Sequence, residues 1–384
     1  MELQNQISDV LLKKRKREKA EDVRGPYYRD TTAIIHSSPF RRLKHKTQVF
    51  FAPSNDHICT RMEHCLHVSS IASTICKGLG LDSEIAWAIG MGHDLGHTPF
   101  GHTGEKILSV KMQRAGFSAF EHEINSLRVV DFLTSHGKGL NLTYAVRDGI
   151  ACHNGEQLVQ SIMPTFSERN LEQITNKKGL IPATYEGAVV RFSDTIAYLG
   201  RDFEDACRLG IIAEEQLPMA VALKLGKRNA QIIDTLVSDV IEHSNSRVGI
   251  SFSDEVFPAV QEMIAFNYQA IYKSPMLEGY ERYFTRLFSL ILDYLGFLLE
   301  TYGFREELYA QEKNMLAMGF YHHLMDMHEA YLERDGNVDR LIYDYVAGMS
   351  DNFCLDCANE ILKPEHLNDN IEHSLTGKWF DVRS

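Results

Sequence analysis

The chain has 384 residues, of which 44% are apolar, and it carries a formal net charge of −12. This composition can bury a large core, in two domains or in one large helical one, and it excludes a disordered chain. The negative charge argues against a surface that binds nucleic acid or membrane as a whole, because phosphate polymers need clustered cations. A polyanionic ligand would therefore need a local basic pocket.

The seven cysteines are scattered, and their one close pair is Cys354-x-x-Cys357. That pair has no second pair nearby and lies in a segment with a helical pattern, so buried thiols are a simpler interpretation than a metal or redox site. The N-terminus is polar and basic, unlike a secretory leader. We therefore expect reduced thiols in a cytoplasmic protein. No run of about 18 apolar residues predicts a membrane span.

Residues 1–25 form a basic N-terminal segment. Its cations stand among helix-forming residues: Lys13, Lys14, Arg15, Lys16, Arg17 and Lys19. The pattern predicts a helix that is frayed or that depends on a partner. A solvated face is the plain interpretation of these charges. Contact with nucleic acid or with another subunit is the alternative.

Residues 27–50 predict a short helical stretch that ends in a basic cluster. The cluster consists of Arg41, Arg42, Lys44 and Lys46. It predicts a phosphate-facing patch in an otherwise acidic protein, with plain exposure to solvent as the alternative. Gln48 precedes an apolar run that is typical of a buried strand or loop. Its amide needs a partner there, which a ligand can supply.

Residues 57–80 predict a helix with one buried stripe. The stripe recurs at three and four residues: Arg61, His64, Val68, Ile71 and Ile75. A lone buried histidine is usually a packing residue. His64 is a stronger candidate for a metal ligand because a second histidine and an aspartate follow it after one helical hairpin.

The second helix of that hairpin is predicted to begin at Asp82 and to end in the run Gly-His-Asp-Leu-Gly-His at positions 92–97. Neighbouring residues on a helix diverge by about 100° and cannot both point along one stripe. His93 and Asp94 can therefore serve one metal only at a helix end. Gly96 helps to supply that end.

A compact glycine-rich turn follows the His-Asp pair and leads into a helix at Glu105. The turn holds His97 and His102, which suggest water handling and phosphate contact rather than packing. The next helix presents His122 followed by Glu123. This pair predicts a histidine that is oriented for acid–base chemistry.

A further helix ends at a loop near His153, and a polar insertion follows it. Residues 187–202 then predict a long helix that carries Asp194, Tyr198 and Asp202 at intervals of four. These three side chains form one polar line on an otherwise apolar helix. Such a line favours contact with a ligand or a metal.

Beyond residue 205 the chain alternates amphipathic helices with short turns, without a long strand pattern, a fixed-period repeat or a low-complexity tract. The sequence therefore predicts an all-α fold. We expect a basic segment at 1–25, a catalytic core at 26–210, and a helical region at 211–384 that packs on the core and on other subunits.

Two imidazoles and two carboxylates from three predicted helices form one candidate metal site: His64, His93, Asp94 and Asp194. This mixed nitrogen and oxygen set suits Mn, Mg, Co, Ni, Fe or Zn, among which the sequence does not choose. With four protein ligands, a six-coordinate ion keeps two positions for water and a phosphate oxygen. That arrangement is typical of a hydrolase.

The chain resembles the HD-domain superfamily and, within it, the deoxyguanosine triphosphate triphosphohydrolase family. The resemblance spans most of the chain and rests on a combination of segments that is specific to this family. The matching segments are Arg-Arg-Leu-Lys-His-Lys-Thr-Gln-Val-Phe (41–50), Thr-Arg-Met-Glu-His (60–64), Gly-His-Asp-Leu-Gly-His-Thr-Pro-Phe-Gly-His-Thr-Gly-Glu (92–105), Phe-Glu-His-Glu (120–123) and Asp-Tyr-Val-Ala-Gly-Met-Ser-Asp (344–351).

The resemblance implies an HD-domain helical core and hydrolysis of a deoxynucleoside triphosphate to deoxynucleoside and tripolyphosphate, by water attack at the α-phosphorus. The departing 5′ oxygen needs a proton donor, and the candidate is His122, oriented by a carboxylate. The catalytic group is then His122, Glu123 and His97. Phosphate contacts are implied for Arg61, His97 and His102, and sugar contacts for Gln48, Tyr198 and Asp202. The family also implies a homo-oligomer and a nucleotide activator.

Two alternatives stay open at this point. HD proteins also cleave phosphomonoesters and phosphodiesters with the same order of ligands. A non-catalytic nucleotide sensor or nucleic-acid-binding regulator would instead use the basic N-terminal segment. Base preference, metal identity, the number of subunits and the need for an activator are not decided by these residues.

Overall fold

A computed structural model describes residues 3–51, 55–154 and 158–362. Helices dominate these residues, so the predicted all-α fold is confirmed. The described strands are β1 (Ser161–Ile162) and β2 (Ile250–Ser251), which pair antiparallel with Ser161 opposite Ser251. None of the described helices is long and apolar enough to cross a membrane.

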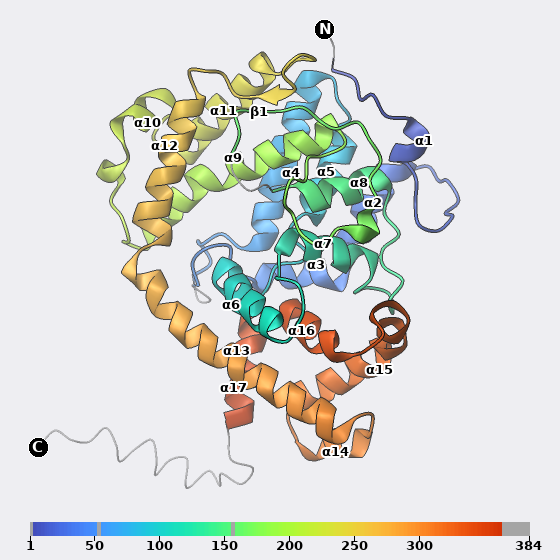
Figure 1. Cartoon of the computed structure of the whole chain (residues 1–384). Coiled ribbons are helices and arrows are strands. Elements are labelled where there is room, and N and C mark those ends of the chain that lie inside the picture. The colour runs from blue at the N-terminus through green and yellow to red at the C-terminus, as the bar shows by residue number, and fades with distance from the viewer. Residues whose placement is uncertain (1–2, 52–54, 155–157, 363–384) are drawn as a thin grey trace, which may run out of the picture.

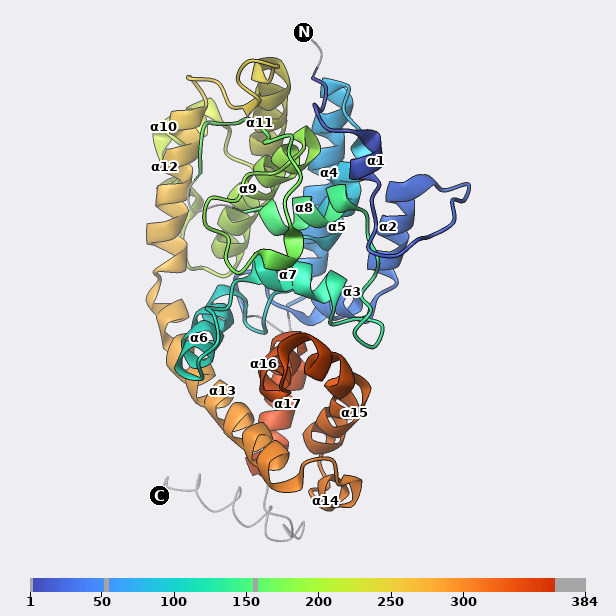
Figure 2. The same ribbon diagram turned by 45° about the vertical axis from the view of Figure 1, so that its right-hand side comes forward.

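The upper part of the molecule in Figures 1 and 2 is built around three helices that pack against one another. They are α4 (Arg61–Leu79), α5 (Ser83–Gly92) and α9 (Tyr185–Arg208). The elements around them are α1 (Asp9–Leu12), α2 (Gly25–Ile35), α8 (Tyr144–Cys152), η2 (Leu171–Gln173), η3 (Glu214–Gln216), α10 (Met219–Lys224), α11 (Asn229–His243), α12 (Phe257–Asn267) and the π-helical turn η4 (Tyr268–Tyr272). Together they bury the larger of the two apolar cores.

Local sequence explains why α4 and α5 begin and end where they do. Thr60 and Glu63 form a reciprocal capping box at the start of α4, and Gly80 closes it with a φ of 71° that favours glycine. Asp82 caps α5 by accepting hydrogen bonds from the amides of Glu84 and Ile85. The predicted stripe of α4 is confirmed, since all five of its side chains are buried.

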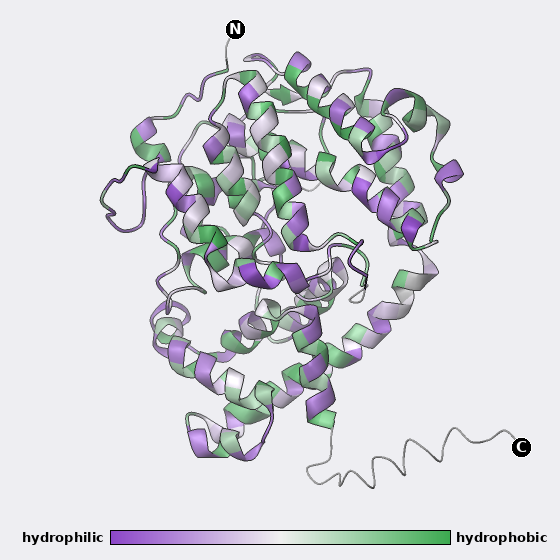
Figure 3. Cartoon of the chain, turned by 180° about the vertical axis from the view of Figure 1, so that it is seen from behind, coloured by the Kyte–Doolittle hydropathy of each residue, from purple (hydrophilic) through white to green (hydrophobic). Residues whose placement is uncertain are grey.

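The lower part of the molecule holds a second apolar core. It joins α6 (Gly101–Arg114) to the C-terminal helices α13 (Pro275–Tyr302), α14 (Glu306–Gln311), α15 (Met315–Asp335), α16 (Asp339–Gly348) and α17 (Asp351–Leu362). Figure 3 shows hydrophilic and hydrophobic residues alternating along these helices, as expected of amphipathic helices with one buried face. Cys354 and Cys357 are buried on α17, as expected. The domain boundaries at 210 and 211 stay a prediction.

Between the two cores lie α3 (Ser38–Arg42), η1 (Leu43–His45) and α7 (His122–Asp131). Asp351, at the start of α17, holds this layer to the C-terminal helices. Its carboxylate accepts hydrogen bonds from the amide of Thr47 at 2.9 Å and from the amide of Phe100 at 2.9 Å.

The basic N-terminal segment differs from its prediction. Its described residues contain only the single turn of α1, and the chain that follows runs irregularly over the core. Arg15 makes a buried ion pair with Asp30 at 2.6 Å, and Lys16 pairs with Asp131 at 3.2 Å. The predicted helix is thus limited to one turn, while the cations other than Arg15 are exposed, as predicted for a solvated face. Arg15 is the exception, because the buried carboxylate of Asp30 attracts it inward.

A buried polar cluster joins α7 to the C-terminal helices. Arg128 donates from Nε to Asp344 at 2.9 Å and from Nη2 to Asp335 at 3.0 Å, and Tyr331 donates to Asp344 at 2.7 Å. Arg128 and Asp344 are almost fully buried. A charge left unpaired at such a place is costly.

We expect Arg128→Ala to lower the free energy of unfolding by about 3–5 kcal/mol, because it removes the cation nearest to the buried Asp344 carboxylate. Urea denaturation measures the change. The matched control is Lys106→Ala, which breaks an exposed ion pair with Glu281 that joins α6 to α13. That variant should lose about 0–1 kcal/mol. Equal losses in both variants would contradict the argument.

Candidate active site

The four predicted metal ligands converge where α4, α5 and α9 meet. His64 lies in the first turn of α4, His93 and Asp94 follow α5, and Asp194 lies in the middle of α9. Nε2 of His64 is 2.9 Å from Oδ1 of Asp194. Nε2 of His93 is 3.5 Å from Oδ1 of Asp94 and 4.0 Å from Oδ1 of Asp194. Donor atoms of His64, His93 and Asp194 lie within 4.8 Å of one another and can share one ion, whereas Asp94 groups at that distance with His93 and His153.

The chemistry of the donors fits a divalent metal. The ring nitrogen Nδ1 of His93 lies 2.7 Å from the carbonyl of Gly90, which can only accept, so Nδ1 carries the proton. The lone pair of Nε2 therefore faces the site, and this buried atom has no hydrogen-bond partner among the described residues. A histidine fixed in this way by a backbone carbonyl is a common metal ligand.

Both carboxylates of the set are ionised, as metal binding requires. Burial opposes ionisation of Asp94, but the neighbouring His93, His97 and Arg61 outweigh burial and hold its pKa well below the usual range. Burial also opposes ionisation of Asp194, and the hydrogen bond to His64 lowers its pKa to about 2 in spite of that. Asp94 also has a positioning contact, a 2.6 Å ion pair with the buried Arg61.

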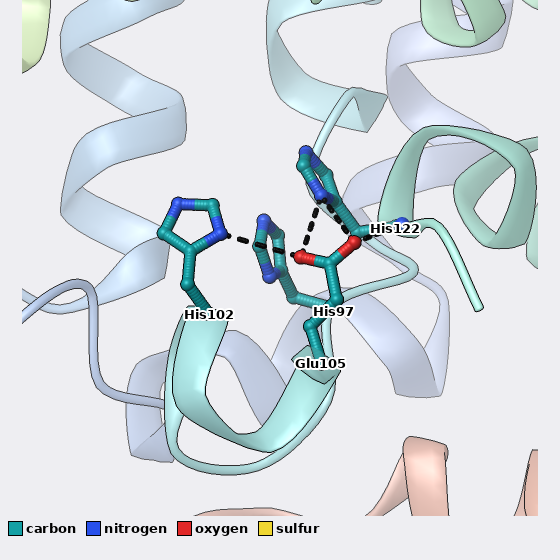
Figure 4. Close-up of side chains that lie close together, drawn as sticks. All are labelled: His97, His102, Glu105 and His122. Carbon is teal, nitrogen blue, oxygen red and sulfur yellow. Dashed lines mark hydrogen bonds and ion pairs between the residues drawn. The ribbon is translucent and has the colours of Figure 1, made fainter. Parts of the chain in front are cut away.

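A second cluster lies beside the first and is centred on Glu105 of α6. Figure 4 shows its carboxylate in contact with the rings of both His102 and His122. The distances are 3.3 Å to Nδ1 of His102 and 3.0 Å to Nδ1 of His122. His97 stacks on His122 with ring centroids 3.8 Å apart and lies 3.2 Å from Oδ1 of Asp94. His97 thus connects the two clusters.

The carboxylate nearest to His122 is Glu105 rather than Glu123. Oε2 of Glu123 is 3.5 Å from Nδ1 of His122, and its other oxygen pairs with Lys177 at 2.8 Å. Burial opposes protonation of His122, but Glu105 and Glu123 more than compensate and raise its pKa to about 9. His122 is therefore a cation at neutral pH.

His153 was seen in the sequence as a helix end but was not assigned to the site. It follows α8 as His93 follows α5, and its Nδ1 likewise donates to a carbonyl three residues earlier, at 2.7 Å. Its Nε2 lies 3.3 Å from Nε2 of His122 and 4.0 Å from Oδ1 of Asp94. The sequence signal for His153 is its position directly after an apolar helix, which is also the position of His93.

The predicted sugar-site residues lie along α9 and on the loop that precedes α4. Tyr198 is half-buried, and Asp202 is buried and accepts a 2.5 Å hydrogen bond from the hydroxyl of Tyr272. Burial raises the pKa of Asp202 to about 7. Nothing in the sequence pointed to Tyr272, which is 70 residues away. The side-chain oxygen of Gln48 is buried without a hydrogen-bond partner among the described residues.

The predicted phosphate-facing patch is wrong for one of its members. Lys46 is 3% exposed, and its ammonium group donates to the backbone carbonyls of His97 and Ala347. It therefore holds the turn behind the site instead of facing a phosphate. His102, in contrast, is exposed beside Glu105, where a ligand can reach it.

Gly96 makes this arrangement sterically feasible. A Cβ at this position would lie 2.1 Å from the amide nitrogen of Ser126 on α7, so any side chain would force the two segments apart. The Gly96 amide donates to Oγ of Ser126 at 2.9 Å, and its carbonyl accepts from Nδ2 of Asn125 at 2.8 Å. Residues 93–97, here called the HD turn, are thus bound directly to α7.

Comparison with known proteins agrees with this geometry. An HD-domain family model matches residues 61–197. A deoxyguanosinetriphosphate triphosphohydrolase-like protein of Caldanaerobacter subterraneus subsp. tengcongensis is 36% identical over 347 residues, which cover 89% of this chain and 86% of that protein. Proteins of the same description from Desulfatibacillum aliphaticivorans and Clostridium tetani are each 35% identical, over 92% and 91% of this chain and 92% and 89% of their own lengths.

We expect Asp94→Ala to abolish binding of Mn²⁺, because it removes a charged donor and leaves Arg61 unpaired beside the remaining ligands. Titration calorimetry or the electron paramagnetic resonance of free Mn²⁺ measures the binding. The control is His67→Ala, which removes a histidine one turn from His64 that does not belong to the donor cluster. Unchanged Mn²⁺ affinity in Asp94→Ala would contradict the assignment.

Proposed function

Because the chain belongs to the deoxyguanosinetriphosphate triphosphohydrolase-like family of HD-domain proteins, we propose that it hydrolyses deoxynucleoside triphosphates of the dGTP type to deoxynucleoside and tripolyphosphate. The observation that carries the proposal is the junction of two clusters. The donor set of His64, His93, Asp94 and Asp194 lies next to the acid–base cluster around Glu105, and His97 bridges them.

The metal would be one divalent ion per site, from the set Mn, Mg, Co, Ni, Fe and Zn, held by those four side chains. When bound, it supplies positive charge for the phosphate and lowers the pKa of water. Arg61, His97 and His102 are proposed to contact the phosphates. Arg61 already lies against Asp94, so its guanidinium is held at the edge of the donor set.

His122 is the proposed acid for the departing 5′ oxygen. A pKa of about 9 means that it carries the required proton at neutral pH. Glu105 holds its Nδ1 side, and Glu123 adds a second negative charge at 3.5 Å. Because Nδ1 of His153 donates to a carbonyl, its Nε2 can accept a hydrogen bond from Nε2–H of His122 until the departing oxygen takes that place.

Gln48, Tyr198 and Asp202 are the proposed sugar contacts. Tyr272 holds Asp202, and Tyr198 lies one helical turn closer to the donor set on the same face of α9. A tyrosine packed under the ribose ring would exclude a 2′-hydroxyl by steric contact. The buried, unpartnered amide oxygen of Gln48 is suited to accept a hydrogen bond from a sugar hydroxyl.

The wider setting is part of the same proposal. We propose a cytoplasmic homo-oligomer in which a basic segment (1–25) and a helical region (211–384) flank a catalytic core (26–210), with a nucleotide activator. A nucleic-acid-binding regulator is less well supported, because Arg15 and Lys16 of the basic segment are engaged by carboxylates of their own chain. Another HD-type phosphatase or phosphodiesterase is the second candidate, favoured by the same donor set.

Product analysis tests the reaction. Incubation of the purified protein with dGTP and Mn²⁺ should release deoxyguanosine and tripolyphosphate in equal amounts, resolved by anion-exchange chromatography. Asp94→Ala should reduce the rate by at least about 100-fold. Release of orthophosphate or pyrophosphate would instead indicate that a different P–O bond is broken. No release from any of the four deoxynucleoside triphosphates, singly or in pairs, would contradict the proposal.

The pH dependence of turnover tests the acid. Because the acid form of His122 is present below its pKa, activity should fall as the pH rises through about 9. Glu105→Gln removes the nearest negative charge, lowers the pKa of His122 and should move this alkaline limb to lower pH. Glu123→Gln is the matched control, and its shift should be in the same direction but smaller.

The exposed His102 is the competing candidate for the acid, since Glu105 contacts it as well. If His102→Ala removes the alkaline limb while His122→Ala keeps it, then His102 is the acid and His122 positions Glu105. If Glu105→Gln leaves the limb where it was, neither histidine is tuned by this carboxylate.

A further inference from the structure

A cavity adjoins the HD turn. Its volume is about 400 Å³, and it is lined by residues of α3, α7 and the C-terminal helices α15 to α17. Leu95 of the HD turn forms part of its wall, whereas none of the proposed catalytic, substrate-binding or metal-binding residues lines it. We call it the α7–α16 cavity. Its volume lies within the range of small-molecule sites.

Two buried oxygen atoms of its lining lack donors. Asn125 is 6% exposed and Asp344 is 4% exposed, and Oδ1 of each has no hydrogen-bond partner among the described residues. The other end of each side chain is already engaged. Nδ2 of Asn125 donates to the carbonyl of Gly96, and Oδ2 of Asp344 accepts from Arg128. Neither side chain can turn to satisfy its free oxygen without losing a buried bond.

A cation completes the lining. Arg42 has no ion pair or hydrogen bond with any residue that the structure describes. The charge of Asp344, in contrast, is compensated by Arg128 and Arg340. Its Nη2 lies 3.6 Å from the position that a Cβ on Gly348 would take, so the guanidinium spans from α3 to the end of α16. Such a planar group is well suited to a phosphate or carboxylate.

The remaining wall selects for size and charge. Val129 and Phe353 are apolar, and Nε2 of His323 is buried without a described partner. Burial lowers the pKa of His323 to about 4, so it adds no positive charge at neutral pH. One unpaired guanidinium favours an anion of low charge over a triphosphate. Two free acceptors favour a molecule that also carries N–H or O–H groups.

We propose that the α7–α16 cavity binds a small organic anion, a phosphate monoester or a carboxylate that also carries hydrogen-bond donors. The anionic group pairs with Arg42, and the donors reach Asn125 and Asp344. Binding itself is independent of the proposed hydrolysis, so failure of one does not entail failure of the other.

The walls of the cavity also hold the HD turn, which gives the ligand a route to the donor set. Asn125 binds the carbonyl of Gly96, and Lys46 bridges the carbonyl of His97 and that of Ala347, a residue of the cavity wall. A ligand that contacts Asn125 therefore acts on the backbone between Asp94 and His97. Its occupancy should change the affinity of the site for Mn²⁺.

Titration calorimetry on the full chain tests the proposal with three probes: ribose 5-phosphate, gluconate and inorganic phosphate. We expect saturable binding of ribose 5-phosphate or gluconate and weaker binding of inorganic phosphate, which cannot reach Arg42 and both oxygens at once. Preference between the two polyols distinguishes a phosphate ester from a carboxylate. Arg42→Met should weaken the binding about tenfold or more.

Two further variants make the test decisive. Arg41→Met removes a neighbouring cation that does not line the cavity, and binding should persist. Leu133→Trp places a large ring in the cavity from a half-buried position and should block binding. The proposal is overturned if no probe binds at about 10 mM. It is also overturned if Arg41→Met weakens binding as much as Arg42→Met, or if Leu133→Trp has no effect.

Discussion

The direct contact between the HD turn and α7 is the constraint on which the site depends. With no side chain at Gly96, the backbone of the turn reaches the amide of Ser126, and both polar groups of Gly96 are bound by α7. This contact brings His97, on the turn, over His122, at the start of α7. The two clusters of the site are therefore neighbours because two backbones are in contact, before any ligand contributes.

Periodicity predicted those parts of the site that local geometry determines. The stripe of α4 and the helix end at His93 follow from spacings of three and four residues and from a break in the helical pattern, so three of the four donors could be expected to lie on core-facing positions. Asp194 could be predicted because its polar line stands out on an apolar helix. In each case the signal lies within one turn of the residue that it concerns.

Contacts between distant segments could not be predicted in the same way. Glu105 reaches His122 across 17 residues and Tyr272 reaches Asp202 across 70, and no local pattern encodes which carboxylate or hydroxyl will meet which partner. Arg15 of the basic N-terminal segment was mispredicted for the same reason. Its charge suggests exposure until the buried acceptor Asp30 is known, and an isolated sequence does not reveal that this carboxylate is oriented toward Arg15.

The length of α13 has a mechanical consequence. Leu277, near its start, packs against the larger core, while Phe284 and Leu298 belong to the smaller one. At 1.5 Å per residue, a helix of 28 residues is about 42 Å long, so a tilt of about 3° at one end displaces the other by about 2 Å. The helix therefore acts as a lever, and small rotations beside Tyr272 become movements of atomic size among the C-terminal helices.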